Sequence, residues 1–378
     1  MNASQPVKVM IVLNTAWNLV NFRIGLIRAL VATGYEVVAV APSDKYADGL
    51  AALGCRFIPV PMDNNGINPA RDLLLLWRLF CLLRTERPNV YLGYTVKPNV
   101  YGSLAARALG IPVINNIAGL GTVFIRGGWL SLFVKSLYRL ALSRSQKVFF
   151  QNNDDRQLFI RSRLVHDGVT DLLPGSGIDL IQFPPTPLPV NVPVRFLLIA
   201  RMLWDKGVGE FVEAARLLKQ RGVGADFCLL GVLDLQNPVA ISRQQMSAWV
   251  AEGVVNYLGV SDNVKVEIAQ ADCIVLPSYR EGTPRALLEA AAMARPIVTT
   301  DSVGCRNVVD DGINGYLCKP KNSSDLADKM LRILSMSHNE REVMGLRGRE
   351  KVKREFDEKI VIRKYLEAIK VAILKSDF

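Results

Sequence analysis

The sequence predicts an α/β protein made of two Rossmann-like domains that face each other across a cleft. Strand-like apolar runs alternate with amphipathic helical stretches along the whole chain, a pattern typical of parallel sheets built from βαβ units. The pattern restarts after a proline-dense stretch at 183–193, where prolines can neither donate ladder hydrogen bonds nor continue a helix. The length of 378 residues also exceeds what one hydrophobic core usually organises.

We therefore expect an N-terminal domain at 1–185 and a C-terminal domain at 186–378, with a last helix near 358–374 that can pack back on the first domain. The expected strands of the first domain are 7–13, 36–41, 55–60, 89–94, 112–117 and 147–152. Those of the second are 195–200, 226–231, 255–259, 273–277, 296–300 and 315–319. Loops at the carboxyl ends of such strands line ligand sites, so functional residues are sought there.

The composition excludes several classes of protein. Hydrophobic residues make up 50% of the chain and charged residues 21%, which excludes intrinsic disorder. Gly and Pro follow no period, which excludes collagen-like and low-complexity proteins. The six cysteines form no CxxC pair, so we expect free thiols in a reducing compartment rather than disulfides or a structural zinc site.

The N-terminal apolar run lacks a signal-peptide cleavage site, and no stretch reaches the roughly 18 apolar residues of a spanning helix. The formal net charge is +11, and residues 1–185 hold most of it, with 19 Lys and Arg against 11 Asp and Glu. Without a basic run or a nucleic-acid-binding motif, this charge does not indicate nucleic acid. An anionic membrane surface or a phosphate-bearing substrate fits it better.

One candidate functional segment, PSYREGTPRALLEAAAMARP, follows the strand expected at 273–277. Thr283 and Pro284 predict a helix start, with a hydroxyl cap and proline at the first helical position. The amino end of such a helix is a natural seat for a phosphate. Glu281 precedes the helix and Glu289 lies inside it, although solvated carboxylates would give the same spacing.

A second segment, ARMLWDKGVGEF, follows the strand expected at 195–200. Arg201 and Lys206 lie in its strand-to-helix loop, and Gly207 permits close approach of the backbone. Two cations at the carboxyl end of a strand suit a diphosphate, although an exposed arginine and a helix-start lysine would look the same.

Together the two segments resemble the nucleotide-sugar site of glycosyltransferase family 4. They share its order of Arg-x4-Lys-Gly followed, about 75 residues later, by Glu-x7-Glu. The resemblance extends to 229–238, 255–260, 271–278 and 303–317, and in the first half to 21–30, 97–99, 101–107 and 118–124. The first-half segments look like the bacterial branch that works on polyprenyl-diphosphate-linked sugars. Members of the family have the GT-B fold and transfer sugars with retention of anomeric configuration.

The resemblance implies roles for residues at matching positions. Arg201 and Lys206 would hold the donor phosphates, Glu281 the transferred sugar and Glu289 the ribose hydroxyls. The other donor-binding positions would be Gly282, Thr283 and Pro284 near the sugar and β-phosphate, and Leu258 and Gly259 near the base. The acceptor would meet Asn21, Phe22, Arg23, Lys97, Asn99, Gly119 and Gly121.

The chain departs from many family members in having no histidine in a matching catalytic loop. Its two histidines are His166 and His338, so we expect no histidine to act in catalysis. There is no Asp-x-Asp pair either, which predicts transfer without a metal or other cofactor. The resemblance then implies a same-face displacement in which the leaving phosphate accepts the proton of the acceptor hydroxyl.

The resulting hypothesis is a retaining hexosyltransferase of bacterial glycan assembly, with a UDP-sugar donor, favoured to be an N-acetylhexosamine, and a polyprenyl-diphosphate-linked acceptor. A UDP-sugar epimerase of related fold, a silent sugar-nucleotide-binding subunit and a transferase with a soluble acceptor are the alternatives. Segments 71–88 and 127–147 combine leucines and aromatics with Arg and Lys, as interfacial helices do and as ordinary sheet-packing helices also can. We expect a cytoplasmic protein, peripheral at the inner face of the cell membrane.

Overall fold

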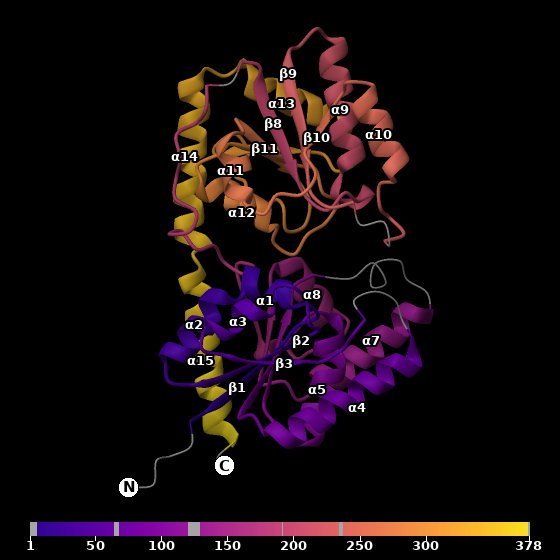
Figure 1. The fold of residues 1–378 in the computed structure, drawn as a ribbon, viewed down its shortest axis with the longest axis vertical. Coiled ribbons are helices and arrows are strands. Elements are labelled where there is room, and N and C mark those ends of the chain that lie inside the picture. The colour runs from indigo at the N-terminus through magenta and orange to yellow at the C-terminus, as the bar shows by residue number, and fades with distance from the viewer. Residues whose placement is uncertain (1–5, 64–67, 120–128, 191, 234–236, 377–378) are drawn as a thin grey trace. The chain divides into compact units, whose positions relative to one another are not determined.

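The structure is a computed structural model that describes residues 6–63, 68–119, 129–190, 192–233 and 237–376 (Figure 1). The chain divides into two compact units. Unit 1 comprises Met1–Ser176 and Glu358–Phe378, and unit 2 comprises Gly177–Asp357. Each unit is an α/β domain built on a parallel sheet.

The boundary between the units falls at 176/177, whereas the sequence places it at 185/186. The backbone N–H of Ile178 donates to the carbonyl of Phe356 at 2.8 Å, and Phe183 packs in the core of unit 2. Arg349 donates to the carbonyl oxygens of Leu180 and Phe183, at 3.1 and 2.6 Å. These bonds fasten the segment before the prolines to unit 2.

Unit 1 contains a seven-stranded parallel sheet in the order β3-β2-β1-β4-β5-β6-β7. Its strands are β1 (Lys8–Val12), β2 (Glu36–Ala41), β3 (Arg56–Pro59), β4 (Val90–Tyr94), β5 (Val113–Ile117), β6 (Lys147–Phe150) and β7 (Thr170–Leu172). The first six confirm the expected strands, and β7 is additional because its short sequence TDL carries no apolar run.

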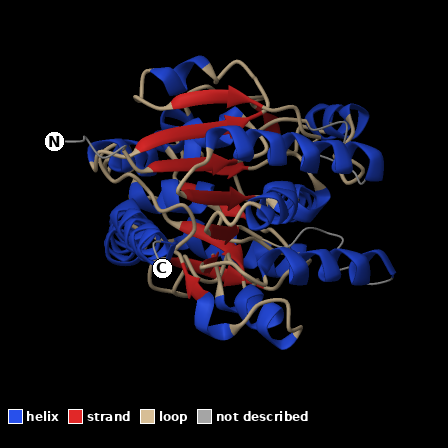
Figure 2. Cartoon of the chain, turned by 90° about the horizontal axis from the view of Figure 1, so that it is seen from below, coloured by secondary structure: helices blue, strands red, loops and turns tan. Residues whose placement is uncertain are grey.

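Helices cover both faces of this sheet (Figure 2). Alternate residues of β1 and β2 point to opposite faces, so Val9 and Ile11 lie in one core cluster and Met10 and Val12 in another. The first cluster includes α1 (Ala16–Phe22), α2 (Ile24–Ala32) and α15 (Glu358–Ser376), and the second α4 (Pro69–Glu86) and α5 (Ser103–Ala108). The remaining helical elements are α3 (Asp48–Ala51), η1 (Pro98–Gly102), α7 (Trp129–Leu142), α8 (Asn153–Arg161) and η2 (Asp167–Val169).

Helix α15 belongs to unit 1 although it is the last element of the chain. Its Tyr365 is 1% exposed in the core of unit 1, beside Tyr94 and Phe149. Lys364 also binds β7, with Nζ 2.9 Å from a carboxylate oxygen of Asp171. The helix therefore completes one face of the first sheet.

Unit 2 contains a six-stranded parallel sheet in the order β10-β9-β8-β11-β12-β13. Its strands are β8 (Val194–Ile199), β9 (Ala225–Leu230), β10 (Asn256–Tyr257), β11 (Cys273–Leu276), β12 (Ile297–Thr300) and β13 (Gly315–Cys318), which confirms the six expected. Helical elements are η3 (Trp204–Lys206), α9 (Val208–Gln220), α10 (Arg243–Ala251), α11 (Val264–Ala269), α12 (Arg285–Ala292), α13 (Ser323–Ser335) and α14 (His338–Glu355). Cores lie on both faces: α9 and α13 contribute to one, and α11, α12 and α14 to the other.

Candidate active site

The predicted cations and carboxylates of unit 2 meet where its strand order reverses direction. Arg201 and Lys206 follow β8, and Glu281 follows β11. These two strands are neighbours in the sheet, while the chain continues outward from them on either side. Ligands of open α/β sheets bind at such a switch point, outside the carboxyl ends of the strands.

Lys206 and Glu281 form an ion pair across this switch point. Nζ of Lys206 lies 2.6 Å from Oε1 of Glu281, and the two side chains are 18% and 16% exposed. The hydroxyl of Ser278 donates to the same carboxylate oxygen at 2.8 Å. Both charged residues were expected in one nucleotide-sugar site from the sequence, whereas no role was expected for Ser278.

Backbone contacts fix the loops that carry the pair. Gly207 has a φ of 74°, and a Cβ placed there would lie 2.1 Å from the carbonyl oxygen of Pro277. The N–H of Tyr279 donates to the carbonyl of Asp205 at 3.0 Å. The two loops therefore approach each other more closely than any other residue at position 207 would allow.

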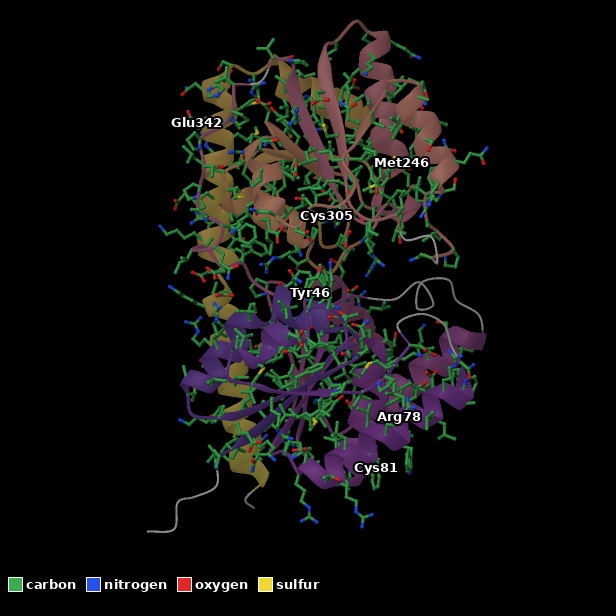
Figure 3. The ribbon with its side chains drawn as sticks, in the orientation of Figure 1. Tyr46, Arg78, Cys81, Met246, Cys305 and Glu342 are labelled. Atoms are coloured by element: carbon green, nitrogen blue, oxygen red, sulfur yellow. The ribbon has the colours of Figure 1, made fainter. Side chains whose placement is uncertain are left out.

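A third loop, which follows β12, supports Glu281 from the other side. The backbone N–H of Glu281 donates to Val303 at 2.9 Å, and Gly304, with a φ of 85°, would clash with the carbonyl of Glu281 if it had a Cβ. The next residue, Cys305 (labelled in Figure 3), is fully buried, and burial raises its pKa to about 11. In the sequence, only the family resemblance of 303–317 marks this loop.

Helix α12 begins one residue later than the sequence predicts. Pro284 occupies the N-cap position in an extended conformation, with φ −72° and ψ 115°, and Arg285 is the first helical residue. The prediction of Thr283 as the cap and Pro284 as the first helical residue is therefore wrong. Gly282, Thr283 and Pro284 nevertheless form the segment that leads into the amino end of this helix.

Glu289 lies on α12 and is paired within the helix. Nε of Arg285 lies 3.0 Å from its Oε1, one helical turn away. Burial raises the pKa of Glu289, and the Arg285 guanidinium opposes part of that rise. Arg285 also donates to the carbonyl of Gly177 at 2.6 Å, so this arginine anchors the start of the unit as well.

Leu258 and Gly259 follow β10, two strands away from β8. The carbonyl of Gly259 accepts a 2.7 Å hydrogen bond from the N–H of Gly231, which follows β9. The side chain of Leu258 is 42% exposed. The structure thus places this expected base-binding segment at the same sheet edge as Lys206 and Glu281.

In unit 1, the expected acceptor residues follow β1, β4 and β5, which are adjacent strands. Arg23, between α1 and α2, is only 5% exposed, and its guanidinium lies 4.4 Å from the centre of the Tyr94 ring. Asn21 is exposed and bonds the carbonyl of Trp17, and Phe22 packs edge-on against the Trp17 ring at 5.1 Å.

Lys97 and Asn99 also have partners inside unit 1. Nζ of Lys97 lies 2.8 Å from a carboxylate oxygen of Asp72, which is 5% exposed in the first turn of α4. Asn99 is buried and donates to the carbonyl of Asn116 at 2.8 Å. Gly119 lies just beyond β5, and Gly121 lies outside the described residues.

Neither histidine lies among these residues. Nδ1 of His166 accepts from the N–H of Gly168 at the start of η2, and the His338 ring contacts the carbonyl of Leu188 at 3.2 Å. Across the parts of the chain that the structure describes, no three His, Cys, Asp or Glu residues gather in a way that could hold a metal ion. Within those same parts, no helix combines the length and apolar character needed to span a membrane.

Two family models match the chain, one in each unit. Residues 193–336 match the model described as glycosyl transferases group 1, and residues 25–175 match the glycosyl transferase 4-like domain. Parallel α/β domains of this kind, with charged residues at the switch point of the second, define a glycosyltransferase of the GT-B fold. The chain is a glycosyltransferase, and both of its units are similar to family 4.

Two curated relatives match most of the chain. It is 29% identical, over 92% of its length and 94% of the relative, to the N,N'-diacetylbacillosaminyl-diphospho-undecaprenol alpha-1,3-N-acetylgalactosaminyltransferase of Campylobacter jejuni. It is 23% identical, over 73% of its length and 74% of the relative, to the UDP-Gal:alpha-D-GlcNAc-diphosphoundecaprenol alpha-1,3-galactosyltransferase of Escherichia coli.

Solved structures share the fold. Anabaena Alr3699/HepE in complex with UDP and glucose gives a TM-score of 0.77 at 16% identity, covering 96% of this chain and 99% of that one. A glycosyltransferase from Rickettsia africae gives 0.77 at 17% identity, covering 98% and 99%.

Proposed function

We propose that the protein transfers a sugar, an N-acetylhexosamine, from a UDP-sugar to a polyprenyl-diphosphate-linked saccharide, with retention of configuration. The observation that carries the proposal is the ion pair of Lys206 and Glu281 at the switch point of unit 2. The names of two relatives support the substrate class, since both describe transfer to a diphospho-undecaprenol-linked sugar and one names a UDP-sugar.

Lys206 suits the stabilisation of a leaving diphosphate. Its ammonium group has three N–H donors, and its only ion pair within the described residues is with Glu281, so donors remain for phosphate oxygens. A cation about 4 Å from a unit negative charge contributes about 4 kcal/mol at an effective dielectric of 20. Arg201, exposed in the same loop, would add a second cation, and no metal would be required.

Glu281 and Glu289 would bind the two ends of the donor. Glu281 would contact the transferred sugar, and Glu289 the ribose hydroxyls. The Arg285 side chain now holds one oxygen of Glu289, so ribose binding would use the other oxygen or displace the arginine. Backbone N–H groups at the start of α12 would lie near the β-phosphate, and Leu258 and Gly259 near the base.

The acceptor would bind at the carboxyl edge of the unit 1 sheet. Asn21 and Phe22 are accessible there and could contact it directly, together with Gly119. Arg23 and Asn99 are buried and bonded to the protein, so their contribution would be to shape that edge. Lys97 is 15% exposed and could offer its remaining donors to an acceptor phosphate.

The acceptor's lipid would bring unit 1 to an anionic membrane at the cytoplasmic face. Helices α4 and α7 carry exposed apolar side chains, with Leu73 66%, Trp77 62%, Leu132 66% and Phe133 51% exposed. Half-exposed aromatic and leucine side chains on such helices are typical of interfacial binding. Not every residue of segment 127–147 would take part, because Leu137 packs in a core cluster and Arg139 binds the end of α8.

Incubation with a panel of UDP-sugars and polyprenyl-diphosphate-linked acceptors tests the proposal. The expected product is a lipid-linked saccharide extended by one sugar with an α linkage when the donor is α. Transfer to soluble sugars alone would contradict the lipid-linked acceptor. An epimerised nucleotide sugar, or binding without reaction, would contradict the proposed transfer itself.

A further inference from the structure

Ser278 contacts the Lys206–Glu281 ion pair of the candidate active site, although no role was expected for it from the sequence. It is fully buried just beyond β11, three residues before Glu281. Its hydroxyl lies 2.8 Å from Oε1 of Glu281, 3.2 Å from the carbonyl of Asp205 and 3.5 Å from that of Arg280. A hydroxyl has one hydrogen, and the charged, nearest acceptor makes the strongest bond.

The backbone of Ser278 is held from the neighbouring strand. Its carbonyl oxygen accepts hydrogen bonds from the hydroxyls of Thr300 and Ser302, the latter at 3.0 Å. All three of these hydroxyl residues are buried. The Ser278 hydroxyl therefore projects from a fixed point, which lets it set the orientation of a carboxylate rather than follow it.

Both donors to Glu281 bind the same oxygen. Lys206 and Ser278 contact Oε1, and within the described residues no hydrogen bond or ion pair involves Oε2. An ionised carboxylate has about four acceptor positions, so Oε2 keeps its full capacity. A substrate hydroxyl could bind it without displacing either donor.

We propose that Ser278 is a positioning residue for sugar transfer: with Lys206 it fixes Oε1 of Glu281, and so presents Oε2 to the transferred sugar. The inference rests on the proposed function, because it assigns Glu281 to the donor sugar. Without Ser278, the carboxylate would pivot about its single bond to Lys206. Donor binding through the nucleotide would persist, while the orientation needed for transfer would be lost.

A double-mutant cycle with Glu281 tests this role, because a merely structural serine would act independently of the carboxylate. The variants are Ser278→Ala, Glu281→Gln and the double variant, with kcat for transfer and donor KM measured for each. We expect Ser278→Ala to lower kcat about tenfold or more, with donor KM within about threefold. In the Glu281→Gln background, the same change should alter the rate by less than about twofold.

Thr299→Val is the matched control. Thr299 is equally buried on β12, and its hydroxyl donates to Leu276 at 2.6 Å without touching Glu281. Its substitution should have the same small effect in both backgrounds. If Ser278→Ala does not fold, Ser278→Cys keeps the shape with a weak donor and should give an intermediate loss that again disappears with Glu281→Gln.

Two results separate the possible failures. A normal kcat for Ser278→Ala, or an equal fold loss with and without Glu281, would overturn the role of Ser278 alone. Absence of transfer by the wild type across the panel would overturn the proposed function, and this inference with it.

Discussion

The side-chain amide of Asn116 donates a 2.8 Å hydrogen bond to the hydroxyl of Tyr365, which lies 249 residues further along the chain. Both side chains are buried, and Tyr365 is one of the residues through which α15 packs in the core of unit 1. The bond joins β5, at the carboxyl edge of the sheet, to the last helix of the chain.

Tyr365→Phe should therefore destabilise unit 1, because it leaves a buried amide without its acceptor. The expected loss is about 1–3 kcal/mol in the free energy of unfolding. Urea unfolding of the full chain measures it, with Tyr35→Phe as control, since Tyr35 packs on the same core and its hydroxyl has no bond within the described residues. Equal stability of the two variants would contradict the role of the Asn116 bond.

Stability should fall at alkaline pH. Burial raises the pKa of Tyr365 and Tyr94 above the usual value near 10, so both stay protonated in the folded state where the unfolded chain ionises. The contribution of the two protonated tyrosines to the free energy of unfolding is complete below about pH 10. It is lost as the pH rises further, by up to about 1.4 kcal/mol per pH unit for each tyrosine. Unfolding curves between pH 8 and 11 measure it, and Tyr365→Phe should show a shallower decline than the wild type.

Lys206→Ala and Arg201→Ala should each strongly lower the rate of sugar transfer while the protein remains folded. Each removes a fixed cation from the carboxyl end of β8, and we expect kcat to fall about 100-fold or more. Steady-state kinetics measures the loss, with circular dichroism to confirm folding. Arg243→Ala on α10, an exposed cation of the same unit, is the control, and rates near normal for both variants would exclude the assignment.

Transfer should persist in excess EDTA. Fixed cations in the loop after β8 would neutralise the leaving diphosphate, so a divalent ion would have no necessary part. The measurement is the transfer rate before and after chelation. Loss of activity that Mg²⁺ or Mn²⁺ restores would refute this account of leaving-group stabilisation.

Unit 1 should bind anionic vesicles through the exposed apolar side chains of α7. Leu132→Ser with Phe133→Ser should abolish most flotation with phosphatidylglycerol vesicles, because these side chains supply the buried apolar area. Val343→Ser with Leu346→Ser on α14 removes exposed apolar side chains from unit 2 and should change little. Equal flotation of the two double variants would make α7 an ordinary sheet-packing helix.

Much of the fold could be predicted because each buried strand leaves a local apolar run. All twelve expected strands form, whereas β7 was missed because three residues, one of them Asp171, leave no such run. The boundary between the units depends on the bond from Ile178 to Phe356, which joins distant residues. No local composition reveals such a contact, so the prolines at 183–193 indicated a later position.

In the candidate site too, some residues could be predicted from the local sequence and others could not. Arg201, Lys206 and Glu281 could be found because charged residues after neighbouring strands meet at one sheet edge. The burial of Arg23 against Tyr94 could not be predicted, because nothing in the sequence around an arginine after a short helix indicates its aromatic partner. Ser278 was missed for a related reason: its importance comes from a distance to Glu281, not from its residue type.

The late position of α15 has a consequence for synthesis on the ribosome. Unit 2 is complete at Asp357, whereas the core of unit 1 lacks Val361, Tyr365 and Ile369 until the final helix emerges. The part of the protein that is made first therefore completes its core last, and the apolar residues of unit 1 that α15 covers stay exposed until that helix is made. Nascent chains halted shortly before Glu358 would be prone to aggregate through the exposed core residues of unit 1. They would depend on chaperones until α15 is synthesised.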